Sequence, residues 1–417
     1  MEERKRIYLC LAHMSEAGLE QKYIQEAFDT NWVVPLGPNV SGFEADLESF
    51  VGQGKHVVAL SSGTAALHLA LLLCGVEKGD EVIVQSFTFC ASSNPVAYLG
   101  ANPVFVDSEA KSWNLSPDML ECAIKSRISE TGKCPKAIIP VALYGMPYDV
   151  DAILKIAAKY NIPVVEDAAE GFGSRWNGRV LGTFGDYGVL SFNGNKMITT
   201  SGGGALICPS EEAKRKAMWL ATQAREAYPY YHHLAIGYNY RMSNICAGIG
   251  RGQMHIVNEH IMHHKHVHEL YENGMKNVKG VEIHSNPTAL SDSNYWLCTL
   301  LLDENVEVKG QGGMYRDAAS ESIGGIISEV HKSKNPHTDC EPNPNVEALR
   351  VWLDKKGIES RPLWKPMHKQ PVYESSVAYC NGVSEALFKK GLCLPSGPMV
   401  SDRDVEYIIQ CICEAIV

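Results

Sequence analysis

The chain has 417 residues, of which 45% are hydrophobic and 21% are charged, and its formal net charge is −10. These values are typical of a globular protein with a large domain and a smaller one, and they exclude disorder as the main state. An acidic chain also lacks the basic footprint that binding to nucleic acid requires.

Cysteines and apolar runs indicate the compartment. Thirteen cysteines, an odd number, are scattered without paired metal-ligand spacing, which is typical of reduced thiols. The N-terminal stretch makes a poor signal peptide, and the longest apolar helix candidate, residues 64–76, is too short to cross a bilayer. We therefore expect a cytoplasmic protein with no membrane partner.

The first expected helix covers residues 15–29, where apolar side chains recur at helical spacing after Ser15, a plausible N-cap. An irregular loop with two prolines follows and contains Asn31 and Trp32. A tryptophan ahead of two valines is as often part of a core as of a binding site. A second helix is expected after this loop.

The next unit is a β-branched strand at His56–Leu60, a small-residue loop and a helix. The loop holds Ser62, Gly63 and Thr64. A helix N-terminus after a strand favours a phosphate dianion, because its amides lack partners and its dipole is positive. The same kind of turn also occurs in many α/β proteins for packing alone.

The pattern repeats with a strand at Glu81–Gln85, a helix near Ser92 and Phe89 in the loop between them. Further strands are expected to end at Asp107 and near residues 144–145, with helical segments in between. This alternation predicts an α/β fold with a mostly parallel sheet and crossover helices. Ligands of such sheets bind at the carboxyl ends of the strands.

Residues 166–204 carry the strongest chemical signal. A strand at Ile162–Val165 is followed by Asp167, and a strand at Tyr187–Leu190 is followed by Ser191, an Asn-Gly turn and Lys196. Pyridoxal phosphate (PLP) needs a carboxylate beside its pyridine nitrogen and a lysine amine for its aldehyde. Taken singly, Asp167 could equally be a helix cap and Lys196 a surface lysine.

The segment SFNGNKMITTSGGG, with its flanks from EDAAEGFG onward, resembles the DegT/DnrJ/EryC1/StrS family of nucleotide-sugar aminotransferases. It is most similar to the branch that aminates 4-keto-6-deoxy sugars, such as the enzymes of the UDP-N-acetylbacillosamine pathway. This resemblance implies fold type I of PLP-dependent transferases, the aspartate aminotransferase-like fold. It divides the chain into residues 1–34 with a substrate loop, a PLP-binding large domain at 35–268, and a small C-terminal α+β domain at 269–417.

The resemblance also implies a role for each residue that matches the family's motifs. Lys196 and Asp167 would be catalytic, and Asn239, in the Gly-Tyr-Asn-Tyr-Arg segment, would reach the cofactor phosphate of a neighbouring subunit. A homodimer with shared sites would follow. The implied cofactor-binding residues are Ser62, Gly63, Thr64, Phe89, Asp167, Glu170, Ser191, Asn193, Lys196 and Asn239, and the implied substrate-binding residues are Asn31, Trp32, Asn239, Tyr240 and Arg241.

The chain departs from the family's pattern at Glu170, where a glutamine is frequent. A glutamine amide can donate a hydrogen bond to the cofactor's phenolic oxygen, whereas an ionised carboxylate can only accept. The sequence leaves three alternatives open: Glu170 is protonated, turned away, or paired with another donor.

The C-terminal part offers further candidates. His260, His264 and His268 recur at four-residue steps on an expected helix and could bind a transition metal, but no carboxylate or thiol completes a site, so a structural helix is favoured. Residues 304–344 lack a sustained period and are rich in Gly, Ser, Pro and Asn, which predicts a surface insertion. Arg361 and His368 either face the substrate or belong to a proline-rich turn.

The resemblance implies transfer of an amino group from L-glutamate to a nucleotide-linked 4-keto-6-deoxy sugar, with UDP-2-acetamido-2,6-dideoxy-4-ketohexose preferred. GDP-linked 4-keto-6-deoxymannose and dTDP-linked keto sugars are alternatives, as is a PLP-binding regulator without catalysis. Lys196 argues against the sugar dehydratases of the family, which carry histidine there.

Overall fold

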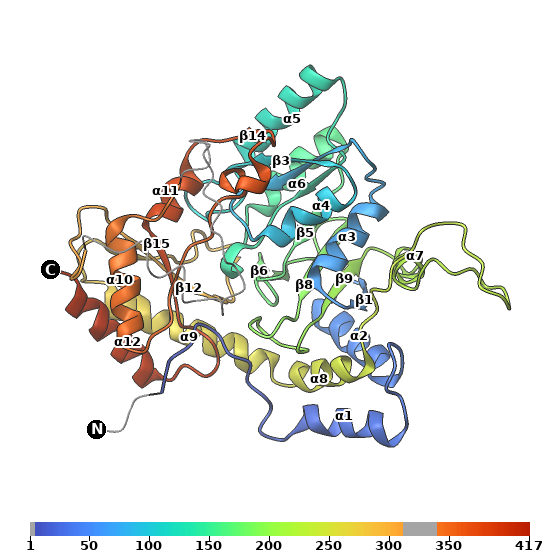
Figure 1. Ribbon diagram of the computed structural model, residues 1–417, viewed down its shortest axis with the longest axis horizontal. Coiled ribbons are helices and arrows are strands. Elements are labelled where there is room, and N and C mark those ends of the chain that lie inside the picture. The colour runs from blue at the N-terminus through green and yellow to red at the C-terminus, as the bar shows by residue number, and fades with distance from the viewer. Residues whose placement is uncertain (1–4, 312–339) are drawn as a thin grey trace, which may run out of the picture.

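The computed structural model describes residues 5–311 and 340–417. Figure 1 shows a large sheet with helices around it, and a smaller group of strands and helices near both chain ends. The long helix α9 (Val257–Met275) runs from the large part to the smaller group, where it packs against α12 (Asp402–Ala415). Within the described ranges, no helix combines the length and the apolar character needed to cross a membrane.

The large sheet consists of two runs of strands joined edge to edge. Backbone bridges from Ile138 to Val164 and from Val141 to Asp167 connect the runs. The described pairings are parallel except those of β9, which is antiparallel to both neighbours, so the predicted mostly parallel sheet is confirmed. In spatial order the strands are β1 (His56–Leu60), β9 (Gly204–Cys208), β8 (Tyr187–Ser191), β5 (Val165–Asp167), then β4 (Ala137–Ile139), β2 (Glu81–Gln85), β3 (Asn102–Val106) and β14 (Ala378–Tyr379).

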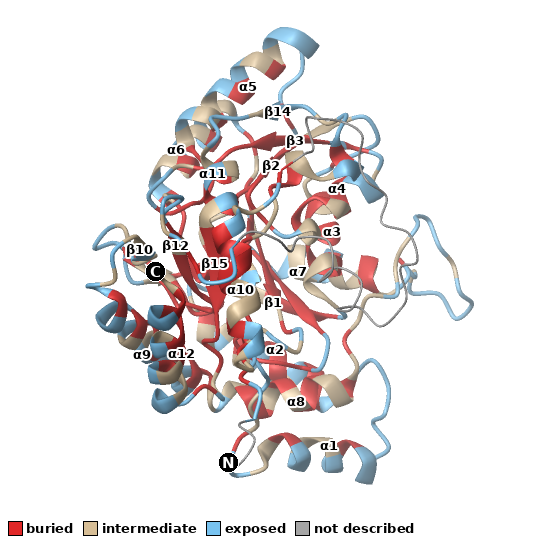
Figure 2. Cartoon of the chain, turned by 60° about the vertical axis from the view of Figure 1, so that its left-hand side comes forward, coloured by how far each residue is buried: buried red, intermediate tan, exposed pale blue. Residues whose placement is uncertain are grey.

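Both faces of this sheet are buried. In β1, Val57 and Val58 belong to different core clusters, because successive side chains of a strand point to opposite faces. The helix α3 (Gly63–Leu73) contributes to one cluster, and α5 (Pro117–Thr131) and α6 (Val150–Tyr160) contribute to the other. Figure 2 shows the buried strands enclosed by helices whose outer faces are exposed.

The remaining helices of the large part lie beside this core. Helices α1 and α2 both pack against α8, and α7 packs against β1. Their bounds are α1 (Leu19–Asp29), α2 (Pro38–Val51), α4 (Asn94–Tyr98), α7 (Glu211–Ala221) and α8 (Asn244–Met254).

The smaller group has its own antiparallel sheet and core. Side chains from α9, α10 and α12 pack with the sheet in one hydrophobic cluster, and Ile7 from the N-terminal segment joins them. Ser401 caps α12 in a reciprocal capping box with Asp404. The elements are β10 (Val281–Ile283), β12 (Cys298–Leu302), β15 (Gly391–Leu394) and β13 (Arg361–Pro362), with α10 (Pro344–Lys355) and α11 (Val383–Lys390). A separate small sheet comprises β11 (Ser291–Asp292), β6 (Arg175–Trp176) and β7 (Arg179–Val180).

Several predicted boundaries were wrong. The first helix begins at Leu19 with Gly18 as N-cap; Ser15 lies outside it, where its hydroxyl accepts from the Leu19 N–H at 2.9 Å and donates to the Glu20 carboxylate. The strand expected at 162–165 is β5 at Val165–Asp167, and β4 ends at Ile139 rather than near residue 144. Of the predicted insertion at 304–344, residues 312–339 lie outside the described residues.

Candidate active site

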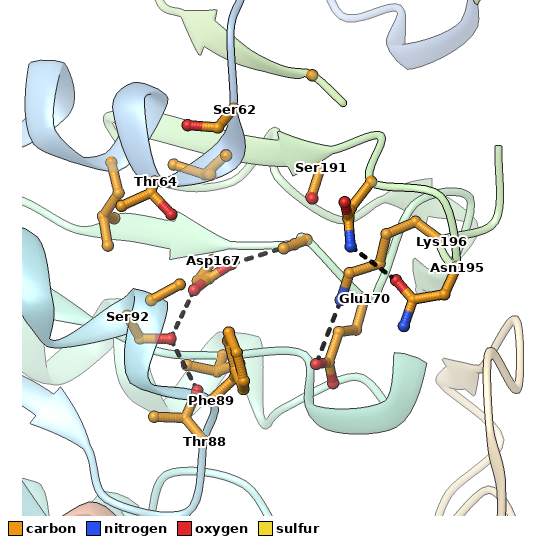
Figure 3. A pocket seen from close by; sticks show the side chains of 18 of the residues that line it. Ser62, Thr64, Thr88, Phe89, Ser92, Asp167, Glu170, Ser191, Asn195 and Lys196 are labelled. Carbon is orange, nitrogen blue, oxygen red and sulfur yellow. Dashed lines mark hydrogen bonds and ion pairs between the residues drawn. The ribbon is translucent and has the colours of Figure 1, made fainter. Parts of the chain in front are cut away.

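A cavity of about 410 Å³ opens at the carboxyl ends of β2, β5 and β8. Figure 3 shows side chains from these ends pointing toward a common space. Nine of the residues that the sequence singles out line this cavity: Ser62, Gly63, Thr64, Phe89, Asp167, Glu170, Ser191, Asn193 and Lys196. The further lining residues include Thr88, Ser92, Asn195, Trp296 and Trp364.

The N-terminus of α3 forms one wall. Ser62 is its N-cap and accepts a hydrogen bond from the Ala65 N–H at 3.0 Å. The first amides of a helix have no partner within the helix, so this end favours an anion. The backbones of Gly63 and Gly204 lie in close contact here, so a Cβ on Gly204 would lie 2.2 Å from the Gly63 nitrogen.

Asp167 is the last residue of β5 and is 7% exposed. The Ser92 hydroxyl donates to its carboxylate at 2.6 Å, and the Ala169 N–H donates to it at 3.1 Å. Ser92 is in turn 2.7 Å from the Thr88 hydroxyl (Figure 3). Burial raises the pKa of Asp167, and the hydrogen bond from Ser92 opposes that rise. A cationic group beside the Asp167 carboxylate would lower this pKa and favour the ionised form.

Lys196 and Glu170 face each other across the cavity floor (Figure 3). The Lys196 Nζ lies 3.4 Å from Glu170 Oε1, and the Tyr144 N–H donates to Glu170 Oε2 at 2.7 Å. Burial raises the pKa of Glu170, while the lysine amine nearby opposes the rise. The carboxylate is therefore turned inward and paired with two donors, which excludes the alternative that it is turned away.

Two tryptophans from the C-terminal part complete the walls. Trp296 lies under the lysine, with Nζ 3.9 Å from the ring centroid. Trp364 lies 5.8 Å from Phe89, centroid to centroid, and Phe89 is 53% exposed. Sequence reasoning missed both tryptophans because their segments carry no recognisable motif, and the aromatic content of WLCTLLLD and RPLWKP was the available signal. It also missed the roles of Thr88 and Ser92, although both lie next to the singled-out Phe89.

The proposed substrate residues do not line this cavity in the single chain. Asn31 has a left-handed φ of 58°, and Trp32 is 39% exposed. Asn239 is exposed, the Tyr240 hydroxyl lies 3.1 Å from His68 Nδ1, and Arg241 is half-buried beside β1.

The other C-terminal candidates make contacts of their own. Arg361 is exposed and bonded to Glu359, and His368 lies between Ser86 at 2.6 Å and Glu385 at 3.3 Å. Neither lines the cavity.

The three histidines of α9 that the sequence singles out are buried and bonded to backbone carbonyls. His260 donates to Met197 O at 3.0 Å, His264 to Tyr295 O at 3.2 Å and His268 to His284 O at 3.0 Å. Among the described residues, no three His, Cys, Asp or Glu side chains gather as they would around a metal ion.

The residues of the cavity fit PLP. A buried carboxylate with two donors, a lysine amine, an open aromatic face and a helix N-terminus correspond to the ring nitrogen, the aldehyde, the ring face and the phosphate of that cofactor. Together with the large α/β sheet they define a class, the PLP-dependent aminotransferases of fold type I.

Comparisons with known proteins agree. The model of the DegT/DnrJ/EryC1/StrS aminotransferase family matches residues 15–331 and 328–413, and the chain belongs to this family. It is 42% identical over 410 residues to the putative pyridoxal phosphate-dependent aminotransferase EpsN of Bacillus subtilis, covering 97% of this chain and 95% of the relative. It is 33% identical over 411 residues to the GDP-perosamine synthase of Escherichia coli O157:H7, covering 98% of both. A crystal structure of a family aminotransferase from Brucella abortus matches with a TM-score of 0.81 and 27% identity over 95% of both chains.

Proposed function

We propose that this chain is a sugar aminotransferase that moves an amino group from L-glutamate to the keto carbon of a nucleotide-linked 4-keto-6-deoxy sugar. The observation that carries the proposal is the position of Lys196 and Asp167 in one buried cavity, with the start of α3 in its wall. A cytoplasmic location is part of the proposal, because the cysteine pattern is typical of reduced thiols.

Bound in this cavity, PLP supplies an electron sink and a carrier for the amino group. Lys196 would hold it covalently, Asp167 would pair with its ring nitrogen, and Ser62, Gly63 and Thr64 would bind its phosphate. Ser191 and Asn193 border the same space, and Phe89 offers an aromatic face to the ring. Lys196 Nζ is then the group placed to take up and return a proton at the reacting carbon. Glu170 Oε1 lies 3.4 Å from this Nζ and can balance the charge of the amine.

The site is proposed to be completed by a second copy of the chain. The segment between α7 and α8 extends away from the body of the molecule (Figure 1), and several of its large side chains are exposed. Tyr231 is 79% exposed and Ile236 is 85% exposed, and exposed hydrophobic side chains gathered on one segment are typical of an interaction site. Asn239, Tyr240 and Arg241 follow on this segment, and Asn31 and Trp32 are exposed as well. A homodimer would bring these residues to the partner's cavity.

The nucleotide and sugar are proposed from the resemblance and the relatives. The likeness of the central segment to the bacillosamine-pathway enzymes supports UDP-2-acetamido-2,6-dideoxy-4-ketohexose as the acceptor. The relative named GDP-perosamine synthase supports the GDP-linked alternative, because it is 33% identical over nearly the whole chain.

One experiment tests the function. Holoenzyme is incubated with glutamate and a panel of UDP-, GDP- and dTDP-linked 4-keto sugars, and the amino sugars formed are measured by mass spectrometry. We expect turnover with one nucleotide series at a kcat/KM at least about a hundred-fold above the others, because rejected ligands leave buried polar groups unpaired. No turnover with any sugar, in protein that binds PLP, would instead support the regulator. Borohydride reduction and peptide mapping of the same sample should place the cofactor on Lys196.

A further inference from the structure

Residues 293–297 connect β11 to β12 and reach from the C-terminal part to the cavity floor. Asn294 is 0% exposed and Trp296 is 2% exposed. Neither residue belongs to the set that the sequence singles out. Trp296 contacts Lys196 and the residue before it, and Asn294 contacts the backbone of Glu170.

Trp296 holds the lysine side of the pair. Its indole N–H donates to the Asn195 carbonyl at 2.6 Å, so the ring is fixed to the residue directly before Lys196. The lysine Nζ lies 3.9 Å from the ring centroid, well within the range of a cation–π interaction. The indole thus fixes both the backbone and the amine of Lys196.

Asn294 holds the carboxylate side. Its Nδ2 donates to the backbone carbonyl of Glu170 at 2.9 Å and to that of Phe172 at 3.0 Å. Its Oδ1 accepts from the backbone N–H of Trp296 at 2.8 Å, which links the two residues. A Cβ at position 145 would lie 1.9 Å from Asn294 Oδ1. The turn at Gly145 therefore leaves room for the Asn294 side-chain amide only because residue 145 is glycine.

We propose that Asn294 and Trp296 form a positioning unit that sets the geometry of the Lys196–Glu170 pair. The inference rests on the proposed role of Lys196. Trp296 acts by keeping the amine over its ring and the lysine loop in place, and Asn294 acts by fixing the turn from which Glu170 projects. The placement of a catalytic group affects the reaction rate more strongly than it affects the affinity for substrate.

The test uses two substitutions at Trp296 and a matched tryptophan elsewhere. Trp296→Phe keeps an aromatic face and removes the indole donor, whereas Trp296→Leu removes both. Trp352 on α10 is the control, because its indole N–H also donates to a backbone carbonyl, Cys411 O at 2.9 Å, and Lys356 lies over its ring at 5.0 Å. Trp352→Phe and Trp352→Leu reproduce the loss of these contacts away from the cavity.

Two readouts are measured for all variants. The first is the fraction of Lys196 labelled by borohydride at limiting PLP, determined by peptide mapping. The second is the pair of kcat and KM for the nucleotide sugar that the wild type prefers. We expect Trp296→Leu to lower both the labelled fraction and kcat about ten-fold, with KM within about two-fold of wild type, because the loss concerns placement rather than binding. Trp296→Phe should recover part of both, and the Trp352 variants should match wild type.

The outcomes separate the inference from the proposed function. Equal labelling and kcat in Trp296→Leu, Trp352→Leu and wild type would overturn the positioning role. If Trp296→Leu does not fold, Trp296→Phe decides, and wild-type values in it would overturn the role of the indole donor. A wild-type label on a lysine other than Lys196 would overturn the proposed function itself.

Discussion

Glu170 is bound from two sides, by the Tyr144 N–H at 2.7 Å and by Lys196 Nζ at 3.4 Å. It is 5% exposed, and removing a carboxylate from water is costly unless its partners compensate. The raised pKa of Glu170 shows that, in the cofactor-free protein, burial outweighs the lysine and the amide. A glutamine would keep an acceptor for the Tyr144 N–H and carry no charge.

We predict that Glu170→Gln changes the pH dependence of stability in cofactor-free protein. Because folding raises the pKa of Glu170, its contribution is fully present below the ordinary carboxyl pKa and is lost as pH rises through the folded value. As the pH is raised from about 4, the ordinary range of a carboxyl pKa, wild type should therefore lose free energy of unfolding relative to the variant. Denaturant unfolding at four pH values measures this. A constant difference across the range would contradict the prediction.

At the junction of β9 and α3, the start of the helix leaves no space for a side chain on the strand. Gly204 pairs with Leu60 on one side and with Ser191 on the other, at the end of the sheet that borders the cavity. A Cβ there would lie 2.2 Å from the Gly63 nitrogen and 2.4 Å from the Ser62 carbonyl carbon. These are backbone atoms that cannot move aside without moving the start of α3.

We predict that Gly204→Ala weakens PLP binding at least about ten-fold and destabilises the protein by about 1–3 kcal/mol, because the helix start must shift. Gly194→Ala is the matched control: it lies in the lysine loop, and its Cβ would meet only Ser201 O at 3.9 Å. PLP titration followed by absorbance and thermal unfolding measure the two effects. Equal PLP affinity in the two variants would show that the contact with Gly63 does not position the phosphate site.

At the element scale, the sequence predicted what short-range patterns encode. The strands at His56–Leu60 and Glu81–Gln85 have the expected bounds, because β-branched residues end there at turn residues. The strand predicted at 162–165 was misplaced. Its first apolar residues belong to the loop that follows α6, and hydrogen-bonded pairing with β8 begins only at Val165. Trp296, Trp364 and Asn294 could not be found, because their roles depend on contacts across more than 100 residues of chain.

At the scale of the whole molecule, the proposed dimer makes a quantitative prediction. Lys196→Ala and Asn239→Asp subunits should each be inactive, and mixing them should restore sites that combine Lys196 of one chain with Asn239 of the other. The aspartate places a like charge against the phosphate and removes a donor. Random exchange gives half heterodimers with one intact site each, so about a quarter of all sites should recover activity.

Turnover of the equal mixture, after subunit exchange is verified by native mass spectrometry, measures this recovery. A mixture of wild type with Lys196→Ala provides the reference for dilution. Activity that stays at the level of the separate variants would mean that Asn239 serves its own chain.

The pairing of β14 with β3 has a consequence for biosynthesis. Ala378 and Tyr379 pair with Phe105 and Val106, and Val377 O accepts from the Phe105 N–H at 2.8 Å. While the chain is being translated, the outer edge of β3 therefore stays unpaired until residues 378 and 379 have left the ribosome. Open strand edges recruit other chains. Ribosome stalling or premature termination before this point would thus release a chain prone to aggregate, so intact translation protects the sheet that carries the site.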